Sequence, residues 1–157
     1  MGCHSYSHQI KDIYSDIPSF LAEVEQYENV MKEALGEERF ASISKVMRFP
    51  GGTTTNSMLS YSEAREYIDA VHEKGYRVYD WTALTGDASG NSEAQEFIDS
   101  LKESLSSAKD KNQSLIVLLH DKWSTNESLE EILEFLISEG YYFDTIDSCP
   151  EYTFAGN

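Results

Sequence analysis

The sequence predicts an α/β protein in which parallel strands alternate with helices that cover the sheet. Four segments repeat apolar residues at helical spacing, and short apolar runs separate them. Glycine or proline follows several of these segments, as expected where elements end. Right-handed crossovers between such strands build either an open doubly wound sheet or part of a barrel. At 157 residues, we expect one domain over residues 1–157.

The most clearly bounded helix is expected over residues 17–35. Asp16 can cap its start, Pro18 fits its first turn, and Gly36 ends it. Apolar residues at helical spacing mark the face that should pack into the core: Phe20, Val24, Tyr27 and Met31.

Two strands should flank the second helix. Residues 43–49 form a short, partly alternating apolar run that stops at a Pro-Gly-Gly turn. The second helix is expected over residues 60–74, with Gly75 as its end, and residues 76–81 are predicted to form the next strand.

The second half of the chain continues the alternation. Residues 82–91 are rich in Thr, Gly, Ser and Asp and should form a loop before a third helix over residues 93–108. The unbroken apolar run at 114–119 is typical of a strand covered on both faces. The remaining predicted elements are a fourth helix, a last strand and a C-terminal tail, over residues 128–138, 141–146 and 149–157.

Composition and charge exclude several classes of partner. The formal net charge of −16 argues against nucleic acid and against an anionic membrane surface, because like charges repel. No apolar run approaches the roughly 18–20 residues of a membrane span. The start of the chain lacks the charged and apolar regions of a signal peptide, so the location of the protein stays open. We expect Cys3 and Cys149 to be free thiols.

Polar residues lie where predicted strands end. Arg48, Asp87 and His120 each end or follow a strand of the expected sheet. Active sites of parallel α/β proteins lie at the carboxyl ends of strands, so these side chains are candidates for one site. Each also has a purely structural explanation: an ion pair for Arg48, a turn for Asp87 and a buried hydrogen bond for His120.

Two of the four histidines, His4 and His8, lie near the N-terminus with i and i+4 spacing. On a helical turn this spacing places both imidazoles on one face, where they can share a metal ion. The alternative is a polar, disordered chain end.

Taken in order, these motifs resemble those of the polysaccharide deacetylases. These are the family 4 carbohydrate esterases with NodB-type domains, which include peptidoglycan N-acetylglucosamine deacetylases and chitin deacetylases. The resemblance covers residues 3 to about 146. Its motifs are His4-Ser5-x-x-His8, Arg48-Phe49-Pro50-Gly51, Asp80-Trp81 leading to Gly86-Asp87, and Leu118-Leu119-His120-Asp121.

The resemblance implies an incomplete, distorted (β/α) barrel that hydrolyses N-acetyl groups of N-acetylglucosamine-containing glycans, such as peptidoglycan or chitin. It implies a divalent metal, usually Zn²⁺, bound by one aspartate and two histidines, for which His4 and His8 are the candidates. It also suggests an extracytoplasmic or cell-envelope location. The remaining roles it implies are His120 as general acid, Arg48 as orienter of the catalytic aspartate, Asp87 as the partner of this arginine, Gly51 as oxyanion donor through its N–H, and Leu118 as lining of the acetyl pocket.

Two departures from the family pattern limit what the resemblance implies. Ala88 follows Asp87, where the family commonly has tryptophan. The family's first motif, a strand ending in two aspartates, has no counterpart in Met1, Gly2 or Cys3. We therefore expect an N-terminally truncated domain that lacks its first strand, its general base and its third metal ligand. Zinc should bind weakly or not at all, and activity should be weak or absent.

Other interpretations stay open. In the first, the chain is a degenerate domain that binds a glycan without hydrolysing it. In the second, the domain completes itself by pairing an open sheet edge with another copy. A third interpretation is a different α/β hydrolase with a two-histidine metal site.

Overall fold

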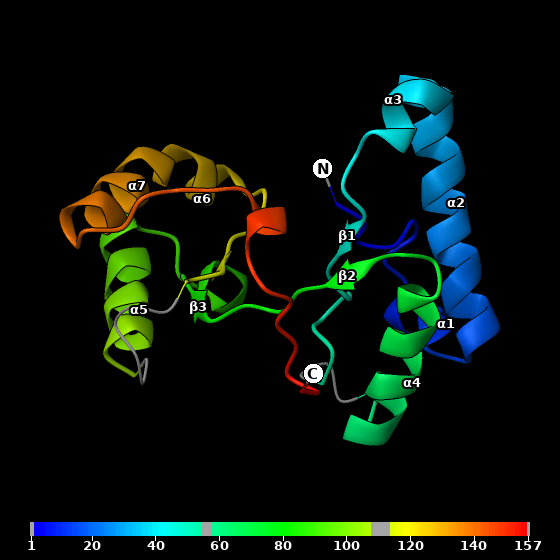
Figure 1. Cartoon of the computed structure of the whole chain (residues 1–157). Helices are drawn as coiled ribbons and strands as arrows, with labels where there is room; N and C mark the ends of the chain where they lie inside the picture. Colours follow the sequence, from blue (N-terminus) through cyan, green and yellow to red (C-terminus); the bar gives the residue numbers. More distant parts are fainter. Residues whose placement is uncertain (1, 55–57, 108–113, 157) are drawn as a thin grey trace. The chain divides into compact units, whose positions relative to one another are not determined.

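The computed structural model describes residues 2–54, 58–107 and 114–156. The chain divides into two compact units, Met1–Asp80 with Pro150–Asn157, and Trp81–Cys149 (Figure 1). The expectation of one domain over the whole chain stays a prediction. No helix within the described ranges is long and apolar enough to cross a membrane.

The first unit contains a small parallel sheet. Strand β1 (Val46–Met47) pairs with β2 (Arg77–Val78) in parallel register. The N-terminal segment joins the free edge of β1 through a parallel bridge between Cys3 and Met47, and Tyr79 forms a parallel bridge with Tyr152. The strands predicted over 43–49 and 76–81 are therefore present in shorter form.

The C-terminal segment differs from the expected tail. The backbone N–H of Asp80 donates to the Tyr152 carbonyl at 2.7 Å, and both Thr153 and Ala155 are buried. The prediction of a tail was wrong. The segment packs in the first unit through backbone pairing with Tyr79, and the segment has no apolar run that would have predicted this.

Four helices are described in the first unit: α1 (Ile10–Ile13), α2 (Ile17–Leu35), α3 (Glu37–Ala41) and α4 (Tyr61–His72). The bounds predicted for α2 are confirmed, and the Asp16 carboxylate accepts a hydrogen bond from the Ser19 N–H at 2.7 Å. Helix α4 begins with a capping box between Ser60 and Glu63.

An aromatic cluster forms the centre of the first unit. The rings of Phe20 and Phe49 lie 4.9 Å apart, and those of Phe20 and Tyr67 lie 5.1 Å apart, both edge to face. The Tyr14 hydroxyl donates to the Pro50 carbonyl at 2.9 Å, and burial raises the pKa of this hydroxyl. The core thus contacts the turn that follows β1 directly.

A second tie to this turn comes from the Asp80 carboxylate, which is fully buried. It accepts from the backbone N–H of Thr53 at 3.0 Å and from the Thr53 hydroxyl. It also accepts from the backbone N–H of Phe154 at 2.7 Å. A single side chain therefore holds both the loop after β1 and the C-terminal segment.

The second unit has its own two-stranded parallel sheet, with β3 (Ala83–Leu84) beside β4 (Val117–Leu118). Its core combines strand and helix residues: Ala83, Phe97, Leu101, Ile132 and Leu136. The other elements are the helices α5 (Ala94–Ser107), α6 (Trp123–Glu127) and α7 (Leu129–Ser138) and the 3₁₀ turns Asp87–Ser89 and Ile146–Ser148.

Several predictions for the second unit need correction. The expected loop at 82–91 contains β3, because its backbone at Thr82 and Ala83 donates to the Ile116 carbonyl. Strand β4 is half-buried and not covered on both faces, and α6 was not expected. Residues 141–146 do not form a strand, since Tyr142 and Phe143 are 88% and 53% exposed without a pairing partner strand in the described structure. The predicted end of the third helix, Ala108, lies outside the described residues.

We expect Asp80→Ala to lower the free energy of unfolding by about 3 kcal/mol, because it leaves buried donors of Thr53 and Phe154 without their acceptor. Urea unfolding followed by circular dichroism measures this difference. Asp69→Ala, at an exposed position on α4, is the matched control and should change stability by less than about 0.5 kcal/mol. Equal effects of the two substitutions would contradict the structural role of Asp80.

Candidate functional site

The two N-terminal histidines lie on a loop that ends before α1. Ser5 and His8 have φ angles of 66° and 57°, which is left-handed backbone, so the helical turn considered for this segment is wrong. The two imidazole rings are nevertheless close, with centroids 5.1 Å apart and planes tilted by 58°. The loop, and not helical periodicity, brings the rings together.

The orientation of His4 follows from the sheet. The Cys3 N–H donates to the Val46 carbonyl at 2.8 Å, and the Arg48 N–H donates to the Cys3 carbonyl at 3.0 Å. This pairing places His4 beside Arg48, and His4 Nδ1 lies 2.7 Å from the Arg48 carbonyl oxygen. A carbonyl only accepts, so Nδ1 carries the proton, and in the neutral ring Nε2 carries the lone pair. Metal-binding histidines commonly have this arrangement.

A glutamate of α2 holds the loop between the histidines. The backbone N–H groups of Tyr6 and Ser7 donate to Glu23 Oε2 at 2.9 and 2.7 Å. Partial burial opposes ionisation of Glu23, but the hydrogen bonds from Ser7 and Tyr6 hold its pKa below the ordinary value. Glu23 was not predicted as a site residue, because it belongs to no motif and is one of many acidic residues.

The donors present suit part of a metal site. Two imidazoles in contact match two ligands of a zinc ion, which prefers nitrogen and sulfur donors. Within the ranges that the structure describes, no group of three or more His, Cys, Asp or Glu side chains is placed to hold a metal. Cys3 belongs to no such group. Burial raises the pKa of its thiol to about 11. Neither Cys3 nor Cys149 is part of a disulfide in the described structure, in agreement with the prediction.

Arg48 and Gly51 belong to the segment that leaves β1. Gly51 and Gly52 have φ angles of 76° and 80°, and the Gly52 N–H donates to the Phe49 carbonyl at 2.9 Å. Glycine fits these left-handed positions without strain. Together with the Tyr14 and Asp80 contacts, this turn is held at several points.

In the second unit, Asp87 and His120 form a hydrogen-bonded pair. Asp87 Oδ1 lies 2.9 Å from His120 Nδ1, and Asp87 Oδ2 accepts from the His120 backbone N–H at 2.7 Å. The Thr125 hydroxyl donates to the same oxygen at 3.0 Å. An ionised carboxylate only accepts, so Nδ1 of His120 donates and Nε2 is the second ring nitrogen available for chemistry. This is the orientation that a carboxylate gives to a histidine that transfers protons.

The electrostatics of Asp87 follow from these contacts. Burial alone would raise the pKa of Asp87, but the hydrogen bonds from His120 and Thr125 hold it below the ordinary value of 3.8. Lys122 Nζ adds a hydrogen bond to the Asp87 carbonyl at 2.7 Å. Lys122 and Thr125 were not predicted as site residues. Their position within five residues of His120 is the one signal in the sequence, and it becomes informative only with the short helix α6.

The loop that carries Asp87 is fixed by Asn91. Its side-chain Nδ2 donates to the Thr85 carbonyl at 2.9 Å and to Ser100 Oγ at 2.8 Å. A Cβ atom at Gly86 would approach Asn91 Nδ2 to 2.6 Å, and Gly86 also has a φ of 76°. Gly86 is therefore the residue that permits this loop to close beside Asp87.

The candidate residues thus form one group in each unit. His4, His8, Arg48 and Gly51 belong to the first unit, and Asp87, Leu118 and His120 belong to the second. Leu118 ends β4 and is half-buried. The expected pairing of Asp87 with Arg48 stays a prediction, since the described partners of Asp87 are His120, Thr125 and Lys122.

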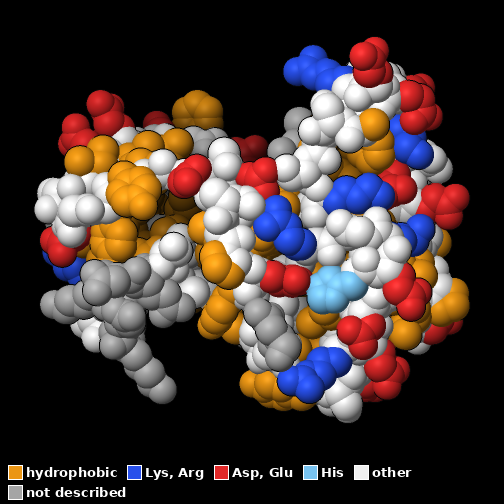
Figure 2. All heavy atoms as spheres, viewed as in Figure 1, with side chains coloured by type: hydrophobic (Ala, Val, Ile, Leu, Met, Phe, Trp, Pro, Cys, Tyr) orange, Lys and Arg blue, Asp and Glu red, His pale blue; other side chains and the backbone are white. Residues whose placement is uncertain are grey.

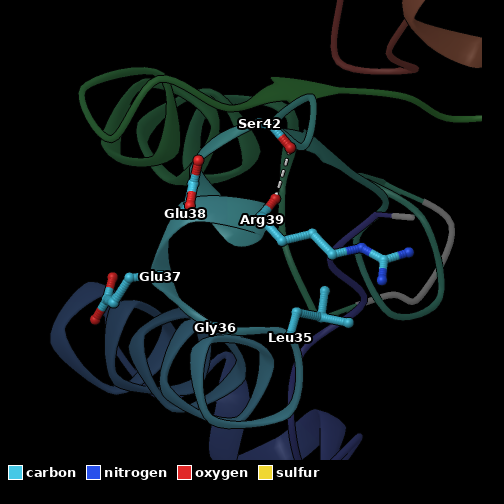
Figure 3. A pocket seen from close by; sticks show the side chains of 6 residues that line it. All are labelled: Leu35, Gly36, Glu37, Glu38, Arg39 and Ser42. Carbon is cyan, nitrogen blue, oxygen red and sulfur yellow. Dashed lines mark hydrogen bonds between the residues drawn. The ribbon is translucent and has the colours of Figure 1, made fainter.

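A hollow of about 510 Å³ lies elsewhere in the first unit, where α2 meets α3. Figure 3 shows the six residues that line it: Leu35, Gly36, Glu37, Glu38, Arg39 and Ser42. Its polar contact is local, from the Ser42 hydroxyl to the Arg39 carbonyl at 2.8 Å. None of the candidate residues lines it, so we assign it no role in the site. Figure 2 shows Asp and Glu side chains scattered over the visible face.

The fold of this chain is similar to that of solved polysaccharide deacetylase structures. The chain superposes on the catalytic domain of a peptidoglycan N-acetylglucosamine deacetylase from Eubacterium rectale with a TM-score of 0.79 and 23% identity, over 99% of this chain and 69% of that one. It superposes on a CE4 esterase from Streptococcus mutans with a TM-score of 0.76 and 25% identity, over 90% and 60% of the two chains.

A polysaccharide deacetylase from Bacillus cereus gives a TM-score of 0.69 and 20% identity over 98% of this chain and 70% of that one. The chain therefore spans between 60% and 70% of the length of these proteins. No model of a protein family matches the sequence, and no curated protein matches it significantly. The NodB-type resemblance is confirmed in the fold, whereas the incomplete barrel stays a prediction.

We expect Asp87→Asn to lower the free energy of unfolding at pH 7 by about 2 kcal/mol through its buried, charge-assisted hydrogen bonds. The lowered pKa of Asp87 stabilises the folded state fully above 3.8, and this contribution is lost as the pH falls through the lower folded value. The difference between parent and variant should therefore shrink below about pH 4.

Urea unfolding at pH 7, 4 and 3 measures this dependence. Asp99→Asn, at an exposed position on α5, is the control and should change stability by less than about 0.5 kcal/mol at pH 7. A parent–variant difference for Asp87 that grows toward pH 3 would show that the carboxylate is not stabilised in the folded state.

Proposed function

We propose that this chain belongs to a metal-dependent deacetylase that hydrolyses N-acetyl groups of N-acetylglucosamine-containing glycans, of the peptidoglycan or chitin type. The single observation that carries the proposal is the hydrogen bond between Asp87 and His120 in a chain with a deacetylase fold. It supplies an oriented histidine of the kind that protonates a leaving amine. The Eubacterium rectale protein, described as a peptidoglycan N-acetylglucosamine deacetylase, supports the substrate class.

The chain's own residues have separate tasks in this proposal. His4 and His8 would hold the divalent metal, most simply Zn²⁺. The Arg48 carbonyl accepts from Nδ1 of His4, which leaves the Nε2 lone pair of the neutral ring to bind the metal. When bound, such a metal lowers the pKa of water and polarises a carbonyl. The Gly51 N–H would stabilise the negative charge that develops on the acetyl oxygen during hydrolysis, and Leu118 would contact the acetyl methyl group. Arg48 would orient the catalytic base.

We propose that turnover by this chain alone is weak or absent. Gly2 and Cys3, which precede His4 in the described structure, carry no carboxylate to act as a third ligand or as the general base. Asp12 and Asp16 are surface positions, and Asp16 already caps α2. The envelope location that the family resemblance suggests belongs to this proposal as well.

A second candidate function is glycan binding without hydrolysis. It is favoured by the donor set, because the described residues bring together two metal-binding side chains and not three. Self-association through a sheet edge stays a prediction, and sedimentation velocity would measure it directly.

Acetate release from N-acetylglucosamine tetramers, with and without added Zn²⁺, tests the proposed function. We expect release far below the usual enzyme rates of about 1–10³ per second. We expect His120→Ala to reduce it a further ~10²-fold or more, because proton donation to the leaving amine is lost. His72→Ala is the matched control, since His72 pairs with Glu151 and is not a candidate residue.

The outcomes separate the two candidates. Release that depends on His120 and on Zn²⁺ supports the deacetylase, whereas tetramer binding by calorimetry without release supports the binding function. Turnover at ordinary enzyme rates would contradict the proposed need for further carboxylates. If the tetramer is neither bound nor hydrolysed, both candidates are wrong.

A further inference from the structure

The loop between His4 and His8 is held from one side by a single carboxylate. Glu23 lies in the second turn of α2, and its Oε2 accepts both the Tyr6 and the Ser7 backbone N–H groups. These two residues lie inside the motif, but Glu23 is 15 residues beyond its last histidine. The contact therefore joins a separate element of the fold to the histidine loop.

The loop needs such support because its backbone is strained. Ser5 and His8 are not glycines, yet their φ angles are 66° and 57°. Left-handed backbone costs about 1–2 kcal/mol for such residues and persists only where surrounding contacts hold it. Two charge-assisted hydrogen bonds to Glu23 and the bond from the His8 N–H to Ser5 Oγ at 3.1 Å are contacts of this kind.

The two rings differ in how they are placed. His4 follows a residue paired in the sheet, and its Nδ1 bonds to the Arg48 carbonyl. His8 is exposed, and the Ser7 N–H bonded to Glu23 belongs to the residue directly before it. The 5.1 Å separation of the rings thus depends on the course of the loop, which Glu23 helps to determine.

We propose that Glu23 is a positioning residue that keeps His8 beside His4, so that the pair can bind a divalent cation. The inference rests on the proposed metal role of the histidines and adds the residue that controls their geometry. Glu23 acts through the Tyr6 and Ser7 N–H groups and is not itself a ligand. Outer residues of this kind typically change metal affinity 10- to 100-fold.

Substitution by glutamine separates positioning from direct ligation. One oxygen of Glu23 accepts both N–H groups, so the amide oxygen of Glu23→Gln can replace it without the negative charge. Glu23→Ala removes the acceptor altogether. If Glu23 bound the metal through its charge, glutamine would be as harmful as alanine.

Calorimetric titration of the full chain with Zn²⁺, and with Co²⁺ followed by its visible absorption, measures the affinity. We expect Glu23→Ala to weaken binding at least 10-fold, and Glu23→Gln to stay within about 3-fold of the parent. Glu25→Ala, at an exposed position on the same helix, should leave the affinity unchanged. The double variant His4→Ala/His8→Ala gives the background from other acidic side chains.

Amide hydrogen exchange at Tyr6 and Ser7 supplies a second readout without metal. Exchange at both sites should become faster in Glu23→Ala and should be restored in Glu23→Gln, with an unchanged exchange pattern in the aromatic core. Parent affinity equal to that of the double histidine variant would overturn the metal assignment and this inference with it. Parent-like affinity in Glu23→Ala, or an equal loss in Glu23→Gln, would overturn the role of Glu23 alone.

Discussion

Backbone pairing on both edges of β1 determines where the polar residues of the first unit lie. On one edge, β1 exchanges hydrogen bonds with Cys3, and on the other the Arg77 and Tyr79 N–H groups donate to Lys45 and Met47. Because these segments run in parallel, their carboxyl ends lie at the same end of the sheet, and the residues that follow them leave the sheet there. His4, Arg48 and Asp80 are these residues. The strands are very short, so each of these few hydrogen bonds carries much of the arrangement.

The two histidine clusters share a design but differ in the partner of Nδ1. For His4 the partner is a neutral backbone carbonyl, and for His120 it is the carboxylate of Asp87. A carbonyl fixes the tautomer of a neutral imidazole, which is the form that binds metal. A carboxylate orients a ring that gains and gives up a proton. Each partner thus fits the role proposed for its histidine, although a carboxylate can also orient a metal-binding histidine.

Sequence patterns predicted the elements whose information is local. The bounds of α2 follow from Asp16, Pro18 and Gly36, which act within one turn of the helix ends. The patterns did not predict the bridge between Tyr152 and Tyr79, because it spans 73 positions and no periodicity records such a contact. At residues 141–146 the pattern predicted a strand that does not form, since side chains that favour strands do not make one without a partner strand.

The same distinction applies to the site. Motif order predicted the candidates His4, His8, Arg48, Asp87 and His120, and their functional roles stay predictions. It did not predict three residues that bond to them or to their loops: Glu23, Lys122 and Thr125. Glu23 is one of 28 acidic residues, and only its contact with Tyr6 and Ser7 sets it apart. Asp80 was noted for its place in a motif, but its ties to Thr53 and Phe154 depend on the fold.

The surroundings of His4 and His8 argue against a loose chain end. Cys3 is buried and paired, His4 bonds to the Arg48 carbonyl, and two amides of the loop bond to Glu23. A polar terminus without function has no need to hold two non-glycine residues in left-handed backbone. Strain of this kind persists where geometry matters, and here the geometry it preserves is the approach of two imidazoles. Among the described residues, the contacts that orient His4 and hold this loop are therefore more complete than any set of metal ligands.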